Sequence, residues 1–137
     1  MPIGLCQVNE RHGLCVVSVV TRVILLDDNP DMLATLKLLL EDGGVEVVPC
    51  VRAAAALEAQ RAHPADVLVT DIFMPDADGL EVIQQFRRNW PATRIIAMSG
   101  GGRKVKGNYL ETAREAGADT ALRKPFDPAE LLRLLTA

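Results

Sequence analysis

The chain has 137 residues, of which 24% are charged and 49% hydrophobic, and its formal net charge is −3. This length suits one domain that buries a core without disulfide or metal staples, and the acidic balance argues against direct nucleic-acid binding. No apolar run approaches the roughly 20 residues that a membrane span needs. The 3 cysteines lack the short paired spacing of zinc or redox sites, so we expect reduced thiols in a cytoplasmic protein.

Residues 1–20 precede the first recognisable motif, and we expect an N-terminal extension here followed by one domain over residues 21–137. The extension shows neither a helical period nor the pattern of an export signal. Its second part, residues 14–20, is apolar and could lengthen the first strand or add a partner strand. The simpler expectation is an extension without a function.

From residue 22 onward, short apolar runs alternate with helical patterns five times. The expected strands are 22–26, 45–48, 67–69, 94–98 and 119–122. The expected helices begin at or near Asn29, Ala53, Asp78, Asn108 and Asp127, which are cap residues except for Ala53. Between the fourth strand and the fourth helix, the glycines and basic residues of 100–108 predict a mobile loop. Five alternations of strand and helix predict an α/β fold with a doubly wound parallel sheet.

Polar side chains stand where four of these apolar runs end. Asp27 and Asp28 follow the first run, Asp71 the third, Ser99 the fourth and Lys124 the fifth. An isolated aspartate at such a place would more often begin a turn. Because ligands of open parallel sheets gather beyond the carboxyl ends of the strands, the whole set indicates one shared site.

This combination resembles the receiver domains of two-component response regulators, and the resemblance runs from about Arg22 to the C-terminus. It rests on the Asp27–Asp28 pair, the D-x-x-M-P sequence that begins at Asp71, and the K-P-F sequence that begins at Lys124, in that family's order. The resemblance implies a five-stranded, flavodoxin-like (βα)5 fold with the strand order 2-1-3-4-5.

The resemblance also implies a reaction. Asp71 would accept a phosphoryl group from a phosphohistidine of a sensor histidine kinase or histidine phosphotransferase, with Lys124 and Ser99 contacting that group. The implied ligands of Mg²⁺ are Asp27, Asp28, Asp71 and the backbone carbonyl of Phe73. Such a chain catalyses its own phosphorylation and dephosphorylation without being a free-standing enzyme.

Two residues depart from the usual pattern of the family. Ala121, three positions before the lysine, stands where the family usually has an aromatic residue that couples to the hydroxyl. Phe73, two positions after the phosphoacceptor, is a bulky apolar residue that could obstruct a hydrolytic water. The departure at Ala121 suggests that output is relayed by a different route.

We expect that route to run from Ser99 through Gly100 and Gly101 to the helix near Tyr109. The receiver would then present a changed surface to a separate protein, because no effector domain fits before the chain ends at Ala137. We expect neither a membrane nor nucleic acid as a direct partner.

Three alternatives remain open at this point. The chain could be a phosphate sink, in which phosphoryl transfer is itself the function. It could be a phosphohydrolase with an aspartate nucleophile, although such enzymes usually carry a second acid where this chain has Phe73. It could also be a pseudo-receiver that binds partners without phosphorylation, although all five site residues are present.

Overall fold

The computed structural model describes residues 5–9, 14–18, 20–74, 77–100 and 109–136, with side chains for 20–73, 79–99 and 111–136. Its helices are α1 (Pro30–Asp42), α2 (Ala53–Ala62), α3 (Gly79–Asn89), α4 (Tyr109–Ala116) and α5 (Pro128–Thr136). Its strands are β1 (Leu5–Asn9), β2 (Leu14–Ser18), β3 (Arg22–Leu26), β4 (Glu46–Cys50), β5 (Val67–Asp71), β6 (Phe73–Met74), β7 (Ala77–Asp78), β8 (Arg94–Gly100) and β9 (Thr120–Lys124). Within the described ranges, no helix combines the length and the apolar character that a bilayer span requires.

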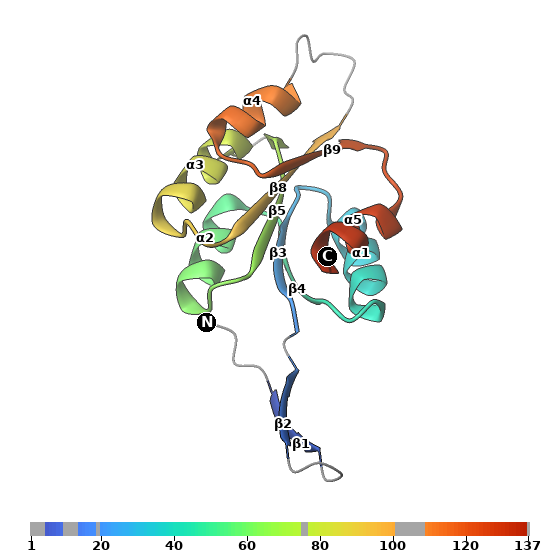
Figure 1. Ribbon diagram of the computed structural model, residues 1–137. Coiled ribbons are helices and arrows are strands. Elements are labelled where there is room, and N and C mark those ends of the chain that lie inside the picture. The colour runs from blue at the N-terminus through green and yellow to red at the C-terminus, as the bar shows by residue number, and fades with distance from the viewer. Residues whose placement is uncertain (1–4, 10–13, 19, 75–76, 101–108, 137) are drawn as a thin grey trace.

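Five of these strands form one parallel sheet in the order β4-β3-β5-β8-β9. Counted among themselves, these strands follow the order 2-1-3-4-5, so the predicted fold class is confirmed. Helices α1 and α5 cover one face of the sheet, and α2, α3 and α4 cover the other (Figure 1). The chain is therefore a three-layer, doubly wound α/β fold.

Each face of the sheet has its own apolar cluster. Against α1 and α5 the helix residues of the cluster are Leu33, Leu36, Leu40, Leu131 and Leu135. Against the other three helices they are Ala56, Val82, Ile83, Phe86 and Ala113. All five residues of the central strand β5 are buried, which is why its sequence reads as a continuous apolar run and not as an alternation.

The first helix begins where the sequence predicts. The side chain of Asn29 accepts hydrogen bonds from the N–H groups of Asp31 and Met32, at 3.1 and 3.2 Å, and Pro30 is the first helical residue. A cap of this kind stabilises a helix by about 1 kcal/mol. It fixes the direction in which the chain leaves Asp27 and Asp28.

Four of the five strands end later than predicted, and β5 for example runs to Asp71. β4 runs to Cys50 and includes Pro49, which an edge strand tolerates because one side of its backbone has no neighbour in the sheet. β8 and β9 continue to Gly100 and Lys124 because these two residues still pair in register. Sequence patterns place strand ends less well than strand centres, since pairing decides where a strand stops.

The segment 14–20 does not lengthen the first strand of the parallel sheet. Residues 14–18 instead form β2, which pairs antiparallel with β1 in a separate two-stranded sheet. A second small hairpin, β6 with β7, lies directly after Asp71, where the sequence predicted only a loop. Neither hairpin was predicted.

The fourth helix begins near its predicted start. α4 begins at Tyr109 and stops at Ala116, before Gly117, whose φ of +130° lies in the region that favours glycine. The predicted cap at Asn108 and the loop residues 101–108 lie outside the described residues. Gly100 itself belongs to β8, not to the loop.

Candidate functional site

The register of the sheet brings the predicted acids together. Leu26 of β3 pairs with Thr70 of β5, so the next residues, Asp27 just after β3 and Asp71 at the end of β5, lie at the same edge. On the other side, Asp71 pairs with Met98 of β8, and β8 in turn ends beside Lys124 of β9. Acids and lysine from three separate strands therefore meet at the carboxyl edge of the sheet.

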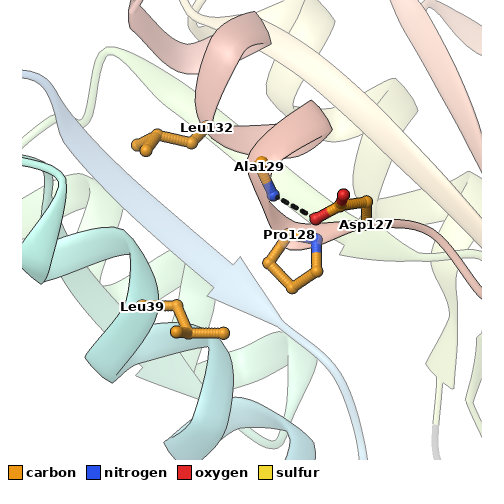
Figure 2. Close-up of a pocket in the computed structure, with 5 residues that line it drawn as sticks. All are labelled: Leu39, Asp127, Pro128, Ala129 and Leu132. Atoms are coloured by element: carbon orange, nitrogen blue, oxygen red, sulfur yellow. Dashed lines mark hydrogen bonds between the residues drawn. The ribbon is translucent and has the colours of Figure 1, made fainter.

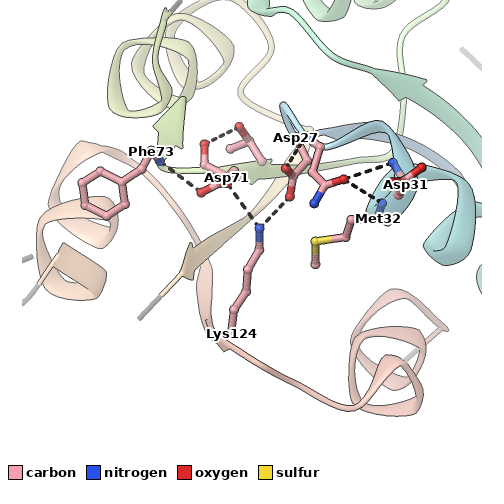
Figure 3. Close-up of polar contacts among 8 residues, drawn as sticks. Asp27, Asp31, Met32, Asp71, Phe73 and Lys124 are labelled. Carbon is pink, nitrogen blue, oxygen red and sulfur yellow. Dashed lines mark hydrogen bonds and ion pairs between the residues drawn. The ribbon is translucent and has the colours of Figure 1, made fainter. Parts of the chain in front are cut away.

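Lys124 joins two of the acids. Its Nζ lies 2.6 Å from Oδ2 of Asp27 and 3.2 Å from Oδ2 of Asp71 (Figure 3). Both carboxylates are buried, with 1% of Asp27 and 6% of Asp71 exposed. Burying two like charges side by side is unfavourable without a counter-charge, and Lys124 supplies one.

Backbone N–H groups hold the remaining oxygens. Oδ1 of Asp27 accepts a hydrogen bond from Asn29 N–H, and Oδ1 of Asp71 accepts one from Phe73 N–H, each at 3.0 Å. The buried hydroxyl of Thr70 donates to the backbone carbonyl of Asp71 at 3.0 Å. Each buried carboxylate thus has one oxygen fixed by its own loop and one directed to Lys124.

The pKa values reflect this burial. Desolvation raises the pKa of Asp71, and the charge of Asp27 adds to the effect, while Phe73 N–H and Lys124 act in the opposite direction. Burial by itself would lower the pKa of Lys124, but its hydrogen bonds and charge interactions with Asp27 and Asp71 raise it overall. The lysine is therefore held as a cation, and the site still favours additional positive charge.

A divalent cation fits this need. Carboxylate oxygens of Asp27, Asp28 and Asp71 all lie within 4.8 Å of one another, and Asp28 is exposed while the other two are buried. Three hard oxygen donors with an open side match the preference of Mg²⁺, which binds through few carboxylates and keeps several waters. The donor set of the chain is thus consistent with the predicted metal.

The sequence profile of the response regulator receiver domain matches residues 23–136. The chain belongs to this family. The matched span contains the parallel sheet except for its first residue, Arg22, together with the five helices and every residue of the site described above. Receiver domains as a family interact with sensor histidine kinases.

Relatives of this receiver domain include larger regulators and one small protein. It is 33% identical over 117 residues to the transcriptional regulatory protein KdpE of Mycobacterium tuberculosis, covering 85% of this chain and 50% of KdpE. It is 32% identical to an uncharacterized 14.6 kDa protein of Leptolyngbya boryana, covering 82% of this chain and 86% of that protein. The receiver domain thus spans about half of the larger regulators that it matches.

Solved structures agree with the fold. A CheY-like receiver domain from Methanospirillum hungatei superposes with a TM-score of 0.78 at 25% identity, covering 86% of this chain and 92% of that one. A receiver domain from Clostridium thermocellum gives 0.76 at 25% identity, over 85% and 92% of the two chains.

The structure describes three further predicted residues of the receiver domain, Ser99, Ala121 and Phe73. Ser99 is 7% exposed and follows Met98, the residue that pairs with Asp71. Ala121 pairs with Ala97 and is partly buried against the apolar cluster beneath α2, α3 and α4. Phe73 is 37% exposed beside Asp71. Of the predicted output residues, Gly101 and the side chain of Tyr109 lie outside what the structure describes.

Two structural details beside Asp71 had no signal in the sequence. One is the hydroxyl of Thr70, which reads as an ordinary β-branched strand residue. The other is Gly79, where a Cβ atom would lie 2.7 Å from Cα and from the carbonyl oxygen of Ile72 and would also meet the carbonyl oxygen of Asp71. The start of α3 therefore packs directly against the backbone of Asp71 and Ile72.

Proposed function

We propose that this receiver domain accepts a phosphoryl group on Asp71 from a phosphohistidine of a sensor histidine kinase or histidine phosphotransferase, and then signals to a separate protein in the cytoplasm. One observation carries the proposal. The amine of Lys124 contacts Asp27 and Asp71 together at the carboxyl edge of the sheet, with Asp28 completing an acidic cluster.

In this reaction an oxygen of Asp71 attacks phosphorus, an O–P bond forms, and the N–P bond to the donor imidazole breaks. The electron pair of that bond stays with the imidazole nitrogen, which takes up a proton. In the proposed reaction Lys124 binds an oxygen of the transferred group, and Ser99 donates its hydroxyl to another. Phe73 N–H keeps Asp71 oriented through the step.

Asp27, Asp28, Asp71 and the backbone carbonyl of Phe73 would hold the Mg²⁺ ion. When bound, the ion neutralises phosphoryl oxygens and so lowers the repulsion between the incoming group and the acids. The chain itself makes two further contributions. It keeps the buried acids apart from bulk water, and it keeps Lys124 positively charged.

The donor needs a surface beside the acids, and α1 and α5 offer one. Both helices start just after site residues, α1 after Asp28 and α5 after Lys124. Leu38 and Leu39 of α1 are 72% and 47% exposed. A pocket of 320 Å³ opens between the helices, lined by Leu39, Asp127, Pro128, Ala129 and Leu132 (Figure 2). Such an apolar groove fits a helix of the phosphohistidine protein.

A relative of similar size supports a receiver whose output partner is a separate protein, since this chain covers 86% of the 14.6 kDa protein of Leptolyngbya boryana. The second candidate function is a phosphate sink, in which no surface change is read. Ala121 favours it, because its methyl group cannot perform the rotation that an aromatic ring would contribute.

The test is phosphorylation with a small phosphodonor and Mg²⁺. We expect a label on the chain that is stable in acid and labile in alkali, as an acyl phosphate is, and we expect Asp71→Asn to abolish it. Asp31→Asn is the matched control, because Asp31 is an exposed acid in the first turn of α1 whose own N–H bonds to Asn29.

If the Asp71→Asn variant became labelled at the wild-type rate, the assignment of Asp71 as the phosphoacceptor would be wrong. Release of inorganic phosphate without labelled protein would instead indicate a phosphohydrolase. Phosphotransfer from the histidine kinases of the source organism would then identify the donor.

A further inference from the structure

The strand that carries Lys124 is held only weakly by apolar packing. Among the described strands β9 pairs with β8 alone, at the edge of the parallel sheet, and Leu122 is the one buried residue of its five. A strand that slips by one residue along its neighbour turns every side chain to the opposite face. Such a slip would take the amine of Lys124 away from Asp27 and Asp71. The register of β9 therefore depends on contacts other than apolar packing.

Asp119, the residue before β9, pairs with Ile95 of β8 in both directions. Its N–H donates to the carbonyl of Ile95 at 2.8 Å, and its Oδ2 accepts the N–H of Ile95, also at 2.8 Å. The carboxylate thus takes the place that a backbone carbonyl would have in the ladder. Ala118 and Thr120 have no carboxylate, so a strand shifted by one residue in either direction would lose this pairing.

Arg87 of α3 holds Asp119 in this position. Its Nη2 lies 2.6 Å from Oδ2 of Asp119. Nη2 and Nε both donate to the carbonyl of Gly117, at 2.8 and 3.0 Å, and Nη1 donates to the carbonyl of Pro91 at 3.0 Å. The planar fork of an arginine makes all these bonds at once, which a lysine could not do. A single side chain thereby ties the ends of α3 and α4 to the start of β9.

The turn before β9 is fitted around the apolar stem of Arg87. At Gly117, where φ is +130°, a Cβ atom would lie 3.1 Å from Cβ and from Cγ of Arg87. An ordinary surface ion pair contributes little to stability, because water screens both charges. The packing of the stem and the bonds to two backbone carbonyls give Arg87 a fixed position that such a pair lacks.

We propose that Arg87, acting through Asp119, sets the register of β9 and so places the amine of Lys124 at the acids of the site. Lys124 follows Asp119 by five residues, about 17 Å along an extended strand. Arg87 is thus a positioning residue, remote from the reacting atoms. The proposal rests on the proposed function for the part that Lys124 plays in phosphoryl transfer, whereas the register of β9 can be measured without any phosphate.

The test combines amide exchange with phosphorylation of the full chain. In Arg87→Gln we expect amide exchange at residues 120–124 to become roughly tenfold faster or more, while exchange in β3 and β5 stays as in the wild type. Labelling of Asp71 by a small phosphodonor should become several-fold slower, because the amine of Lys124 is less often in place. Mg²⁺ affinity should not fall, since the proposed ligands of the ion lie outside β9.

A second substitution checks that the two residues act together. Asp119→Asn removes the charge that Arg87 contacts, and it should give the same pattern more weakly. Combined with Arg87→Gln, it should slow labelling no further than Arg87→Gln alone, because both changes break one set of contacts. If Arg87→Gln does not fold, Arg87→Lys takes its place. It keeps the charge without the fork and should also speed exchange at residues 120–124 selectively.

Two controls separate this role from general effects. Arg88→Gln is the matched control, because Arg88 is the exposed neighbour of Arg87 on α3, and it should leave exchange and labelling unchanged. Gly44→Ala is the control for stability, since Gly44 lies between α1 and β4. It should speed exchange without any preference for β9.

Three results would overturn the proposal: wild-type exchange at residues 120–124 in Arg87→Gln, faster exchange spread evenly over the sheet as in Gly44→Ala, or labelling that the substitution does not slow. The two proposals can fail separately. A wild-type chain that takes no label would refute the proposed function, while amide exchange would still test the register of β9. Normal labelling of wild type and Arg87→Gln alike would refute the positioning role alone.

Discussion

The three acids of the site differ in their burial and in their contacts with Lys124, and we expect them to have different roles. Asp27 and Asp71 are buried and bonded to Lys124, while Asp28 is exposed at the open side of the cluster. A metal that keeps several waters binds from the open side. We therefore propose that Asp28 has the ion as its main partner.

The first residue-scale prediction compares Asp28 with Ser99. Asp28→Ala should weaken Mg²⁺ binding roughly tenfold or more, since it removes one of few charged ligands. Ser99→Ala should leave Mg²⁺ affinity nearly unchanged and slow phosphorylation, because its hydroxyl is assigned to the phosphoryl group. Titration of each variant with Mg²⁺ measures the difference, and equal losses of affinity would refute this division.

The second residue-scale prediction concerns the ring of Phe73, which is 37% exposed beside Asp71. If the ring screens the acyl phosphate, Phe73→Asn should shorten the lifetime of phosphorylated Asp71 several-fold by admitting water in line. Phe73→Leu is the control that keeps an apolar side chain. The decay of labelled protein measures the lifetime, and one that stays equal or grows longer in Phe73→Asn would contradict the screening role.

At the scale of elements, the start of α3 is fitted against the end of β5. Gly79 lets the helix approach the backbone of Asp71 and Ile72, and its N–H donates to the carbonyl of Ile72 at 3.2 Å. The short hairpin of β6 and β7 spans the same connection. The position of Asp71 thus depends on packing between two elements as well as on the strand itself.

Gly79→Ala should lower both stability and activity. The added Cβ meets backbone atoms that cannot rotate away, so we expect a loss of about 1–3 kcal/mol in the free energy of unfolding, together with slower phosphorylation. Chemical denaturation and the labelling assay measure the two effects.

Gly44→Ala is the matched control for this substitution. Gly44 has a φ of +92°, but no atom lies within 4 Å of the position of its Cβ. The change should cost about 1–2 kcal/mol through backbone strain and leave phosphorylation of the remaining folded protein unchanged. If both variants lost stability without a change in labelling, the proposed contact between α3 and the site would have no functional role.

For the molecule as a whole, the question is how phosphorylation reaches the surface. Ser99 and Gly100 end β8, and α4 begins at Tyr109, so a hydroxyl drawn toward phosphate would pull on the chain that leads into α4. At its other end α4 is anchored, because the guanidinium of Arg87 donates to the carbonyl of Gly117 at 2.8 and 3.0 Å. A change that enters at Ser99 would therefore be largest at the start of α4.

Amide exchange with and without a beryllofluoride mimic tests this relay. We expect altered protection from Gly100 through Ala113 and little change around Gly117. Changes confined to the acidic site would favour the phosphate sink. The same experiment on Ser99→Ala serves as the control, since removal of the hydroxyl should abolish the distant change.

Much of this protein could be predicted from the sequence because its signals are local. Apolar runs marked the five strands of the parallel sheet, and helical patterns marked the five helices that cover it. Asn29 with Pro30 marked the start of α1. The proximity of Asp27, Asp28, Asp71 and Lys124 was also predictable, because parallel strands deliver their carboxyl ends to one edge, whereas the roles of these residues stay predictions. Strand order followed from resemblance to a family and not from the residues alone.

Only the tertiary structure decided the contacts between residues that are far apart in the sequence. Lys124 and Asp27 are 97 residues apart in sequence, and only sheet register and packing bring Nζ within 2.6 Å of the carboxylate. The hydroxyl of Thr70, the fit of Gly79 and the pairing of β1 with β2 likewise depend on neighbours remote from any local pattern. Periodicity and caps act over a few residues, whereas a contact between elements is set by the whole packed sheet.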